Sequence, residues 1–247
     1  MRTLLAVASL VALATQAAIV SYAAADPGIR QEPVQFARGA SSTVIKGRLQ
    51  GDADVDYLVR AHAGQTLSVT LEESNAQNYF NVLPPDTDVA MFVGSDGSDF
   101  TRVLPVDGDY TIRVYLMRPA ARRNESSDYT LGIAVNGSAL APLPASQDAL
   151  IPGTPFHAST TIPCVPFLET QPRDCEAFVI RRGFGGTATV EIPLANALKR
   201  RILFVNGEPV ASDSPDPLTA TRQEDVTTVR LGTDERYEIP DMLVSGG

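Results

Sequence analysis

The chain has 247 residues, of which 44% are hydrophobic and 20% are charged, and its formal net charge is −9. An acidic surface argues against nucleic acid as a partner, because phosphate backbones are bound by lysine and arginine, and it favours encounter with a basic protein. The length is sufficient for one or two domains with their own cores.

The first 25 residues have the order of features of a secretory signal peptide. Arg2 precedes an apolar stretch at 4–20, and three alanines at 23–25 come directly before Asp26. This order predicts cleavage after Ala25. The alternative is an uncleaved anchor, but the many alanines make the stretch weak as a permanent span. We therefore expect a periplasmic or secreted protein with no membrane span after signal cleavage.

Residues 26–137 have the pattern of an antiparallel β-sandwich. Apolar and polar residues alternate with a period of two, which is typical of strands with one buried face. Turns rich in glycine and aspartate separate the segments, as in sandwich folds, and no helical periodicity is evident. The strands expected here are 43–49, 56–61, 65–71, 110–116 and 129–135, with a further apolar run at 89–93.

A second, smaller antiparallel β domain is expected at 159–247, after a linker at 138–158. The linker contains four prolines and little apolar periodicity, so it should be semi-rigid. In the second domain, a glycine-rich run at 183–186 and the dipeptide Asn206-Gly207 predict hairpin turns. The strands expected here are 176–182, 187–192, 201–205, 225–231 and 235–239.

The chain has two cysteines, Cys164 and Cys175, and both lie in the second domain. An isolated close pair in an exported chain predicts a disulfide. The bond would contribute about 3 kcal/mol in the chain-entropy model. A redox pair is disfavoured because CxxC spacing is absent, and a metal site is disfavoured because His157 is the only histidine nearby.

No catalytic constellation can be assembled from the sequence with confidence. A GxSxG motif is absent, and the two histidines, His62 and His157, are interpreted as surface residues. A Ser/His/Asp triad can draw its members from distant positions, so a hydrolase is kept as the third function considered. We expect neither an enzyme nor a cofactor.

Three aspartates alternate at Asp52, Asp54 and Asp56, as calcium ligands often do. An EF-hand loop requires glycine at its sixth position and glutamate at its twelfth, where this chain has Tyr57 and Ala63. We therefore assign no metal. A calcium site of another type on this loop is the alternative to a solvated turn.

A basic cluster stands out on the connection between the strands expected at 110–116 and 129–135. Its members are Arg113, Arg118, Arg122 and Arg123. One interpretation is a solubilising loop. The functional interpretation is a loop whose arginines bind carboxylates of a partner, because guanidinium groups bind carboxylates in planar bidentate geometry.

These elements together resemble a known family. The run GDADVDYLVRAHAGQTLSVTL at 51–71 resembles the bacterial pre-peptidase C-terminal-like β-sandwiches. More narrowly, VQFARGASS at 34–42 is similar to the start of the periplasmic inhibitors of goose-type (g-type) lysozyme. The same order continues in GDYTIRV at 108–114, in 118–124 and in Tyr129. The resemblance covers residues 34–135.

The resemblance implies a sandwich whose loops enter the substrate cleft of the lysozyme. Arg118 matches the position of one key arginine, with Arg122 and Arg123 steering and Asn124 shaping the loop. A lysozyme cleft carries the carboxylates that cleave glycosidic bonds, and a guanidinium would pair with them. Asp52 occupies the position at which the family has a tyrosine as its second key residue for binding the lysozyme.

We therefore expect an exported binding protein that inhibits a g-type lysozyme by placing an arginine-bearing loop in the active-site cleft. The alternative is a general envelope module that binds glycan or protein without inhibiting an enzyme. The second domain resembles a short disulfide-containing module of exported proteobacterial proteins, carried by FVIRRG at 178–183. That resemblance supplies no chemistry, so a structural or tethering role is expected.

Overall fold

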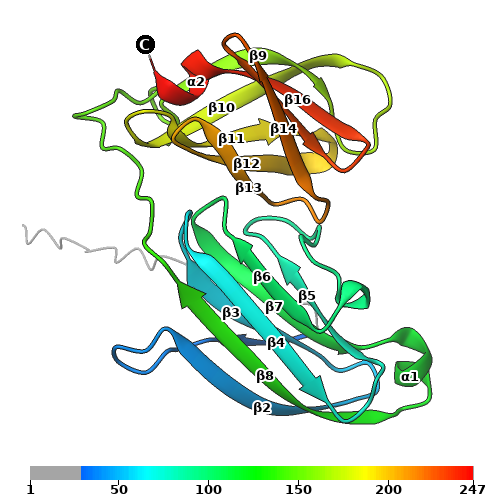
Figure 1. Ribbon diagram of the computed structural model, residues 1–247. Coiled ribbons are helices and arrows are strands. Elements are labelled where there is room, and N and C mark those ends of the chain that lie inside the picture. The colour runs from blue at the N-terminus through cyan, green and yellow to red at the C-terminus, as the bar shows by residue number, and fades with distance from the viewer. Residues whose placement is uncertain (1–28, 247) are drawn as a thin grey trace, which may run out of the picture.

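The computed structural model describes residues 29–246, which form two β domains (Figure 1). The predicted β-sandwich, followed by a second small antiparallel β domain with one disulfide, is confirmed. The predicted signal peptide lies outside the described residues. Among the described residues, no helix has the length and apolar character needed to cross a membrane.

The first domain is a sandwich of two four-stranded sheets. The strand order is β1-β3-β7-β5 in one sheet and β2-β8-β4-β6 in the other. Every pair is antiparallel except β1 and β3, which run parallel. The strands are β1 (Ile29–Pro33), β2 (Ser42–Gln50), β3 (Asp54–Ala61), β4 (Thr66–Glu73), β5 (Asn78–Leu83), β6 (Asp99–Val103), β7 (Gly108–Leu116) and β8 (Ser126–Asn136).

The predicted alternation corresponds to β2, β3, β4, β7 and β8, whereas β1, β5 and β6 were not predicted. β5 lacks a clean alternation because Asn78 is buried and its side-chain amide donates to Ser127 Oγ at 3.0 Å. The apolar run at 89–93 forms only an isolated bridge between Phe92 and Val82. The 3₁₀ helix η1 (Gly94–Asp96) and the α-helix α1 (Arg118–Arg122) are too short to show a helical period.

A tyrosine pair joins the two sheets inside the sandwich. The hydroxyls of Tyr57, on β3, and Tyr129, on β8, lie 2.7 Å apart and are buried. Burial raises the pKa of Tyr129. Gly47 lies directly opposite Tyr129 on β2, and a Cβ at this position would overlap the Tyr129 hydroxyl. A glycine is therefore required at position 47 for the tyrosines to meet.

The second domain is an eight-stranded sheet with the order β13-β12-β11-β10-β9-β16-β15-β14. The sheet curls so that its two edge strands, β13 and β14, contact each other. The strands are β9 (Ala158–Val165), β10 (Arg173–Gly183), β11 (Thr187–Pro193), β12 (Lys199–Val205), β13 (Glu208–Ser212), β14 (Leu218–Gln223), β15 (Val226–Leu231) and β16 (Glu235–Pro240). The 3₁₀ helix η2 (Ala195–Ala197) precedes β12, and the helix α2 (Asp241–Ser245) packs against β10 and β11.

The predicted disulfide between Cys164 and Cys175 is confirmed. It connects the neighbouring antiparallel strands β9 and β10, and both cysteines are buried in the core of the second domain. The bond therefore closes the base of the loop that joins these two strands.

The expectation that both histidines lie on the surface is wrong for His157. His62 has a half-exposed side chain, but His157 is only 7% exposed. The Arg181 N–H donates to His157 Nδ1 at 3.0 Å, so Nδ1 is an acceptor and Nε2 carries the proton that bonds the Leu143 carbonyl at 3.0 Å. The end of the proline-rich segment is therefore anchored to the second domain.

Arginines bind backbone carbonyls across the domain interface. Arg102, on β6, donates to the carbonyls of Ser214 and Pro215 at 2.8 and 2.9 Å. In the opposite direction, buried Arg201 on β12 donates to the Pro85 carbonyl at 2.9 Å. A small apolar cluster packs between them; it consists of Ala63, Leu203 and Ala211, with Val103, Leu140 and Val205 at its rim.

The third interface arginine, Arg182, has a side chain that is fully buried. It pairs with Asp107 Oδ2 at 2.7 Å, and it donates to the Leu140 carbonyl at 2.7 Å and to Thr189 Oγ1 at 2.8 Å. The Thr189 hydroxyl in turn donates to the Pro105 carbonyl at 2.7 Å. Burial alone would raise the pKa of Asp107, but Arg182, the Ala63 N–H and His62 hold it below its ordinary value.

Replacing Arg182 should loosen the interface. We expect Arg182→Met to lower the free energy of unfolding by about 3 kcal/mol, because it leaves buried acceptors without their donor, and urea unfolding would measure this loss. Arg60→Met is the matched control, since the Arg60–Asp109 pair is exposed and such pairs contribute little. Equal loss in both variants would contradict the assigned role of Arg182.

The same pair should make stability depend on pH. Because the folded-state pKa of Asp107 is lowered, its contribution is present above the ordinary carboxyl pKa and is lost as the pH falls through the folded value. The difference in unfolding free energy between wild type and Asp107→Asn should therefore shrink on acidification.

We propose domain boundaries at 26–137 and 159–247, with 138–158 between them. Residues 144–147 are exposed, and limited proteolysis should cut at or near them. The two fragments should nevertheless elute together in size-exclusion chromatography, because the arginine contacts do not depend on the continuity of this segment. Separate elution would mean that the interface is held only by the covalent connection.

Candidate binding site at the free end of the sandwich

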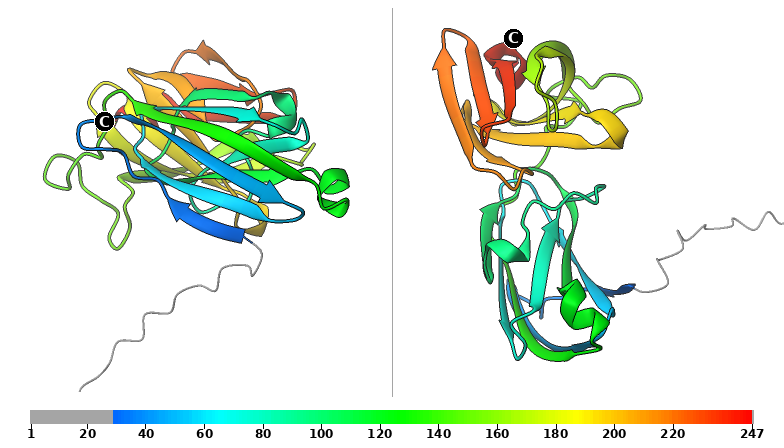
Figure 2. Two further views of the ribbon diagram at one scale, coloured as in Figure 1. Left: turned by 90° about the horizontal axis from the view of Figure 1, so that it is seen from below. Right: turned by 90° about the vertical axis from the view of Figure 1, so that its right-hand side faces the viewer.

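The predicted binding residues lie together at the end of the sandwich that faces away from the second domain (Figures 1 and 2). Arg118 and Arg122 begin and end α1, and Arg123 and Asn124 follow it. Asp52 lies in the turn between β2 and β3. All five side chains belong to exposed residues. β8 starts beside α1 and ends near the interface, so the two ends are separated by the length of this strand.

The backbone around α1 is held in place by its neighbours. The Met117 N–H, just before the helix, donates to the Gln77 carbonyl at 2.8 Å, and Ala120 is fully buried against the core of the sandwich. Asn124 ends this segment with a φ of 55°, the left-handed conformation that asparagine tolerates better than most residues. The helix is therefore short but fixed in position.

The Asp52 turn packs directly against the α1 connection. The Gly51 N–H donates to the Glu125 carbonyl at 2.9 Å. Gly51 has a φ of 60°, and a Cβ on it would lie 2.9 Å from Asn124 Oδ1. The structure thus brings Asp52 and Asn124 to neighbouring turns although 72 positions separate them in the sequence.

Glu125, which the sequence analysis did not select, connects three loops at this end. Its carboxylate accepts from Arg123 Nε at 2.6 Å and from Asn75 Nδ2, in the β4–β5 loop, at 2.9 Å. The hydrogen bond from Asn75 and the bond and charge of Arg123 lower the pKa of Glu125. No local sequence signal marks Asn75 as its partner, because the two residues are 50 positions apart.

The three predicted arginines therefore differ in their surroundings. Arg123 is paired with Glu125. Within residues 29–246, the side chains of Arg118 and Arg122 make neither a hydrogen bond nor an ion pair. Their guanidinium groups are available to a partner, which is the arrangement needed for recognition of a carboxylate.

Arg113 does not belong to this group. It lies on β7 and pairs in bidentate geometry with buried Asp56 on β3, at 2.7 and 2.9 Å. Burial raises the pKa of the neighbouring Asp54, with Arg113 opposing the shift. Asp56 is thus engaged by a guanidinium, and within the described residues no group of three or more His, Cys, Asp or Glu side chains is arranged to hold a metal ion.

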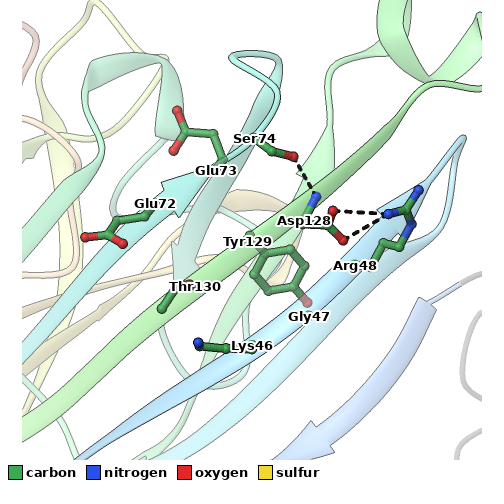
Figure 3. Close-up of a pocket in the computed structure, with 9 residues that line it drawn as sticks. All are labelled: Lys46, Gly47, Arg48, Glu72, Glu73, Ser74, Asp128, Tyr129 and Thr130. Atoms are coloured by element: carbon green, nitrogen blue, oxygen red, sulfur yellow. Dashed lines mark hydrogen bonds and ion pairs between the residues drawn. The ribbon is translucent and has the colours of Figure 1, made fainter.

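An open groove of about 690 Å³ lies on the outer face of the β2–β8–β4 strands, near the same end (Figure 3). Thr130 on β8 lies directly between Lys46 on β2 and Glu72 on β4. The next row holds the exposed ion pair between Arg48 and Asp128 at 3.1 Å. The groove is shallow, and it is lined by charged side chains of both signs, among them Lys46 and Glu72.

No protein-family model matches the chain. A curated relative is the inhibitor of g-type lysozyme from Escherichia coli (strain K12), which is 27% identical over 104 residues; the alignment covers 41% of this chain and 78% of the relative.

Solved structures match a similar share of the chain. The Aeromonas hydrophila PliG structure, a periplasmic lysozyme inhibitor of g-type lysozyme, is 34% identical with a TM-score of 0.42 and covers 44% of this chain and 97% of its own. The pre-peptidase C-terminal domain of a Bacillus anthracis collagenase is 15% identical with a TM-score of 0.30 and covers 44% and 94%.

The Aeromonas protein is periplasmic, in agreement with the exported location predicted for this chain. The matches cover the N-terminal part, so the second domain lies beyond them. The first domain is thus similar in sequence to inhibitors of g-type lysozyme, the resemblance that the sequence analysis gave for residues 34–135.

Proposed function

We propose that this chain is an exported inhibitor of a g-type lysozyme and that it acts by inserting the α1 connection into the cleft of the enzyme. The observation that carries the proposal is the sequence similarity to such inhibitors in a domain whose free end displays unpaired arginines. The action is binding without a covalent step, and the similarity on which it rests concerns the first domain alone.

Arg118 is the proposed key residue. It is the first residue of α1, on the connection between β7 and β8, and it is exposed. Its guanidinium would pair with a catalytic carboxylate and occupy the sugar site. Because buried Ala120 fixes α1 against the core, little conformational freedom is lost when the loop enters the cleft, which favours affinity.

The other residues of the site take different roles. Arg122 is unpaired within the described residues and would steer the encounter by its charge. Arg123 is bound by Glu125, so we assign it to bracing the loop rather than to steering. Asn124 shapes the loop through its left-handed backbone.

Asp52 is the one residue of the site that should oppose the proposed binding. Its carboxylate is exposed on the turn beside Asn124. A carboxylate at this place would face the acidic groups of a lysozyme cleft and oppose binding. We therefore propose that Asp52 reduces affinity for g-type lysozyme relative to a tyrosine at the same position.

A second candidate function is binding to another envelope component, protein or glycan, without inhibition. The groove with Lys46 and Glu72 on opposite sides favours it, because within residues 29–246 neither side chain has an ion-pair partner. A lytic assay separates the two functions, since only the first predicts loss of lysozyme activity.

Removing Arg118 should weaken inhibition most. We expect Arg118→Ala to raise the inhibition constant by a factor that corresponds to about 2 kcal/mol, typical of an interface arginine, whereas Arg122→Ala should mainly slow association and reduce its salt dependence. Asp52→Tyr should tighten binding. The measurement is lysis of bacterial cells by goose-type, chicken-type and invertebrate-type lysozymes, with Arg60→Ala as the control.

Full goose-type lysozyme activity in the presence of micromolar wild-type protein would refute the proposed inhibition. The binding of another envelope component would then be the better account.

Glu125 should position the arginine loop. We expect Glu125→Ala to speed amide exchange at Gly51 and through the α1 connection, because the side-chain bonds to Asn75 and Arg123 are lost. Glu125→Gln, whose amide oxygen still accepts a hydrogen bond, should restore part of the protection. Inhibition of the lysozyme should likewise be strongest for the wild type, weaker for Glu125→Gln and weakest for Glu125→Ala. Unchanged exchange in Glu125→Ala would contradict this role whether or not the protein inhibits a lysozyme.

A further inference from the structure

A loop of the second domain, residues 166–172, displays the apolar side chain of Leu168 to solvent. The loop joins β9 to β10 (Figure 1) and is closed at its base by the Cys164–Cys175 disulfide. Glu169 and Arg173 brace it through two bonds, Arg173 Nε to Oε2 at 2.9 Å and Nη2 to Oε1 at 3.1 Å. The covalent closure and this ion pair together restrict the loop.

Leu168, near the tip of this loop, is 83% exposed and has a φ of 65°. The left-handed conformation costs a leucine of order 1 kcal/mol or more, and such strain is retained mainly where a site uses it. Exposure of a large aliphatic side chain adds a second cost. A stable loop that keeps both features is preorganised to present Leu168.

Two arginines lie beside the loop. Val165 at the end of β9 is directly opposite Arg236 on β16, which is directly opposite Arg230 on β15. Like charges opposite each other destabilise a sheet. Arg236 Nε is buried without a hydrogen bond, and the carboxylate oxygen paired with it, Glu238 Oε1, is 3.7 Å away. Within residues 29–246, this arginine pair has no carboxylate at hydrogen-bond distance.

The loop and the arginine pair border one pocket of about 500 Å³. Four carboxylates also line it. Glu169 and Glu235 are engaged by Arg173 and by buried Arg200, respectively. The others are Asp216 and Asp234. These two charges oppose the binding of any anion, and they oppose a dianion more than a single carboxylate, for which the arginine pair supplies hydrogen-bond donors.

We propose that this pocket binds a peptide carboxylate that is carried next to an aliphatic side chain. The carboxylate would bind between Arg230 and Arg236, and the aliphatic group would contact Leu168 and Phe167. The carboxylate can be a glutamate side chain or a chain terminus, which share this chemistry. The site is separate from α1 and does not depend on the proposed inhibition of lysozyme.

The test uses the full mature chain labelled with ¹⁵N and titrated with small peptides. Acetyl-Leu-Glu-Leu-amide supplies a side-chain carboxylate, acetyl-Gly-Leu-Leu supplies a terminal one, and acetyl-Leu-Gln-Leu-amide supplies none. We expect saturable shifts at the loop and at β15 and β16 with one or both acidic peptides, and affinity at least about tenfold lower for the glutamine peptide, since a charge-assisted bond is lost.

Matched variants separate binding from folding. The double change Arg230→Ala and Arg236→Ala should abolish the shifts and leave the protein folded, because these side chains lie outside the core. Leu168→Gly should weaken binding while raising the melting temperature, since glycine removes the strain. Arg60→Ala, in the first domain, should change neither.

Three results would overturn the proposal. They are absence of shifts with both acidic peptides, equal binding of the glutamine peptide, and unchanged affinity after loss of both arginines. Binding of inorganic phosphate at the same residues as tightly as the peptides would also overturn it, because it would show a general anion site.

Discussion

Guanidinium groups that cross the domain interface to bind backbone carbonyls or, for Arg182, the Asp107 carboxylate are the contacts on which the arrangement of this protein depends. Arg102, Arg182 and Arg201 all lie at one end of the sandwich. A buried arginine must satisfy several donors at fixed angles, so these contacts specify one relative placement of the domains. One end of the sandwich is therefore closed, and the end that carries α1 is left open.

At the open end, a smaller network of charge-assisted hydrogen bonds holds the loops together. Glu125 binds Arg123 and Asn75 and joins the Gly51 turn through its carbonyl. These bonds connect three loops that would otherwise move separately. These loops lose their conformational entropy when the protein folds. Binding of a partner therefore adds little further entropy loss. Within the described residues, Arg118 and Arg122 are left unpaired on this support.

The second domain reaches rigidity by another route. Its curled sheet buries a modest core, and the Cys164–Cys175 disulfide closes the loop that displays Leu168. The second domain lies at the end of the sandwich away from α1 (Figure 2), and Arg102, Arg182 and Arg201 make the contacts between the domains. A partner of the second domain and a partner of α1 would therefore contact different parts of the molecule.

The sequence by itself determined the features that depend on neighbouring residues. Alternation at 110–116, the Asn206-Gly207 turn and the single cysteine pair led to correct strands, a hairpin and the disulfide. For the site, motif order placed Arg118 on an exposed connection. Tertiary structure decided the rest: the burial of His157, the Arg113–Asp56 pair, the role of Glu125 and the domain interface. These contacts join residues tens of positions apart, and the energy of a buried hydrogen bond depends on a partner that no local pattern identifies.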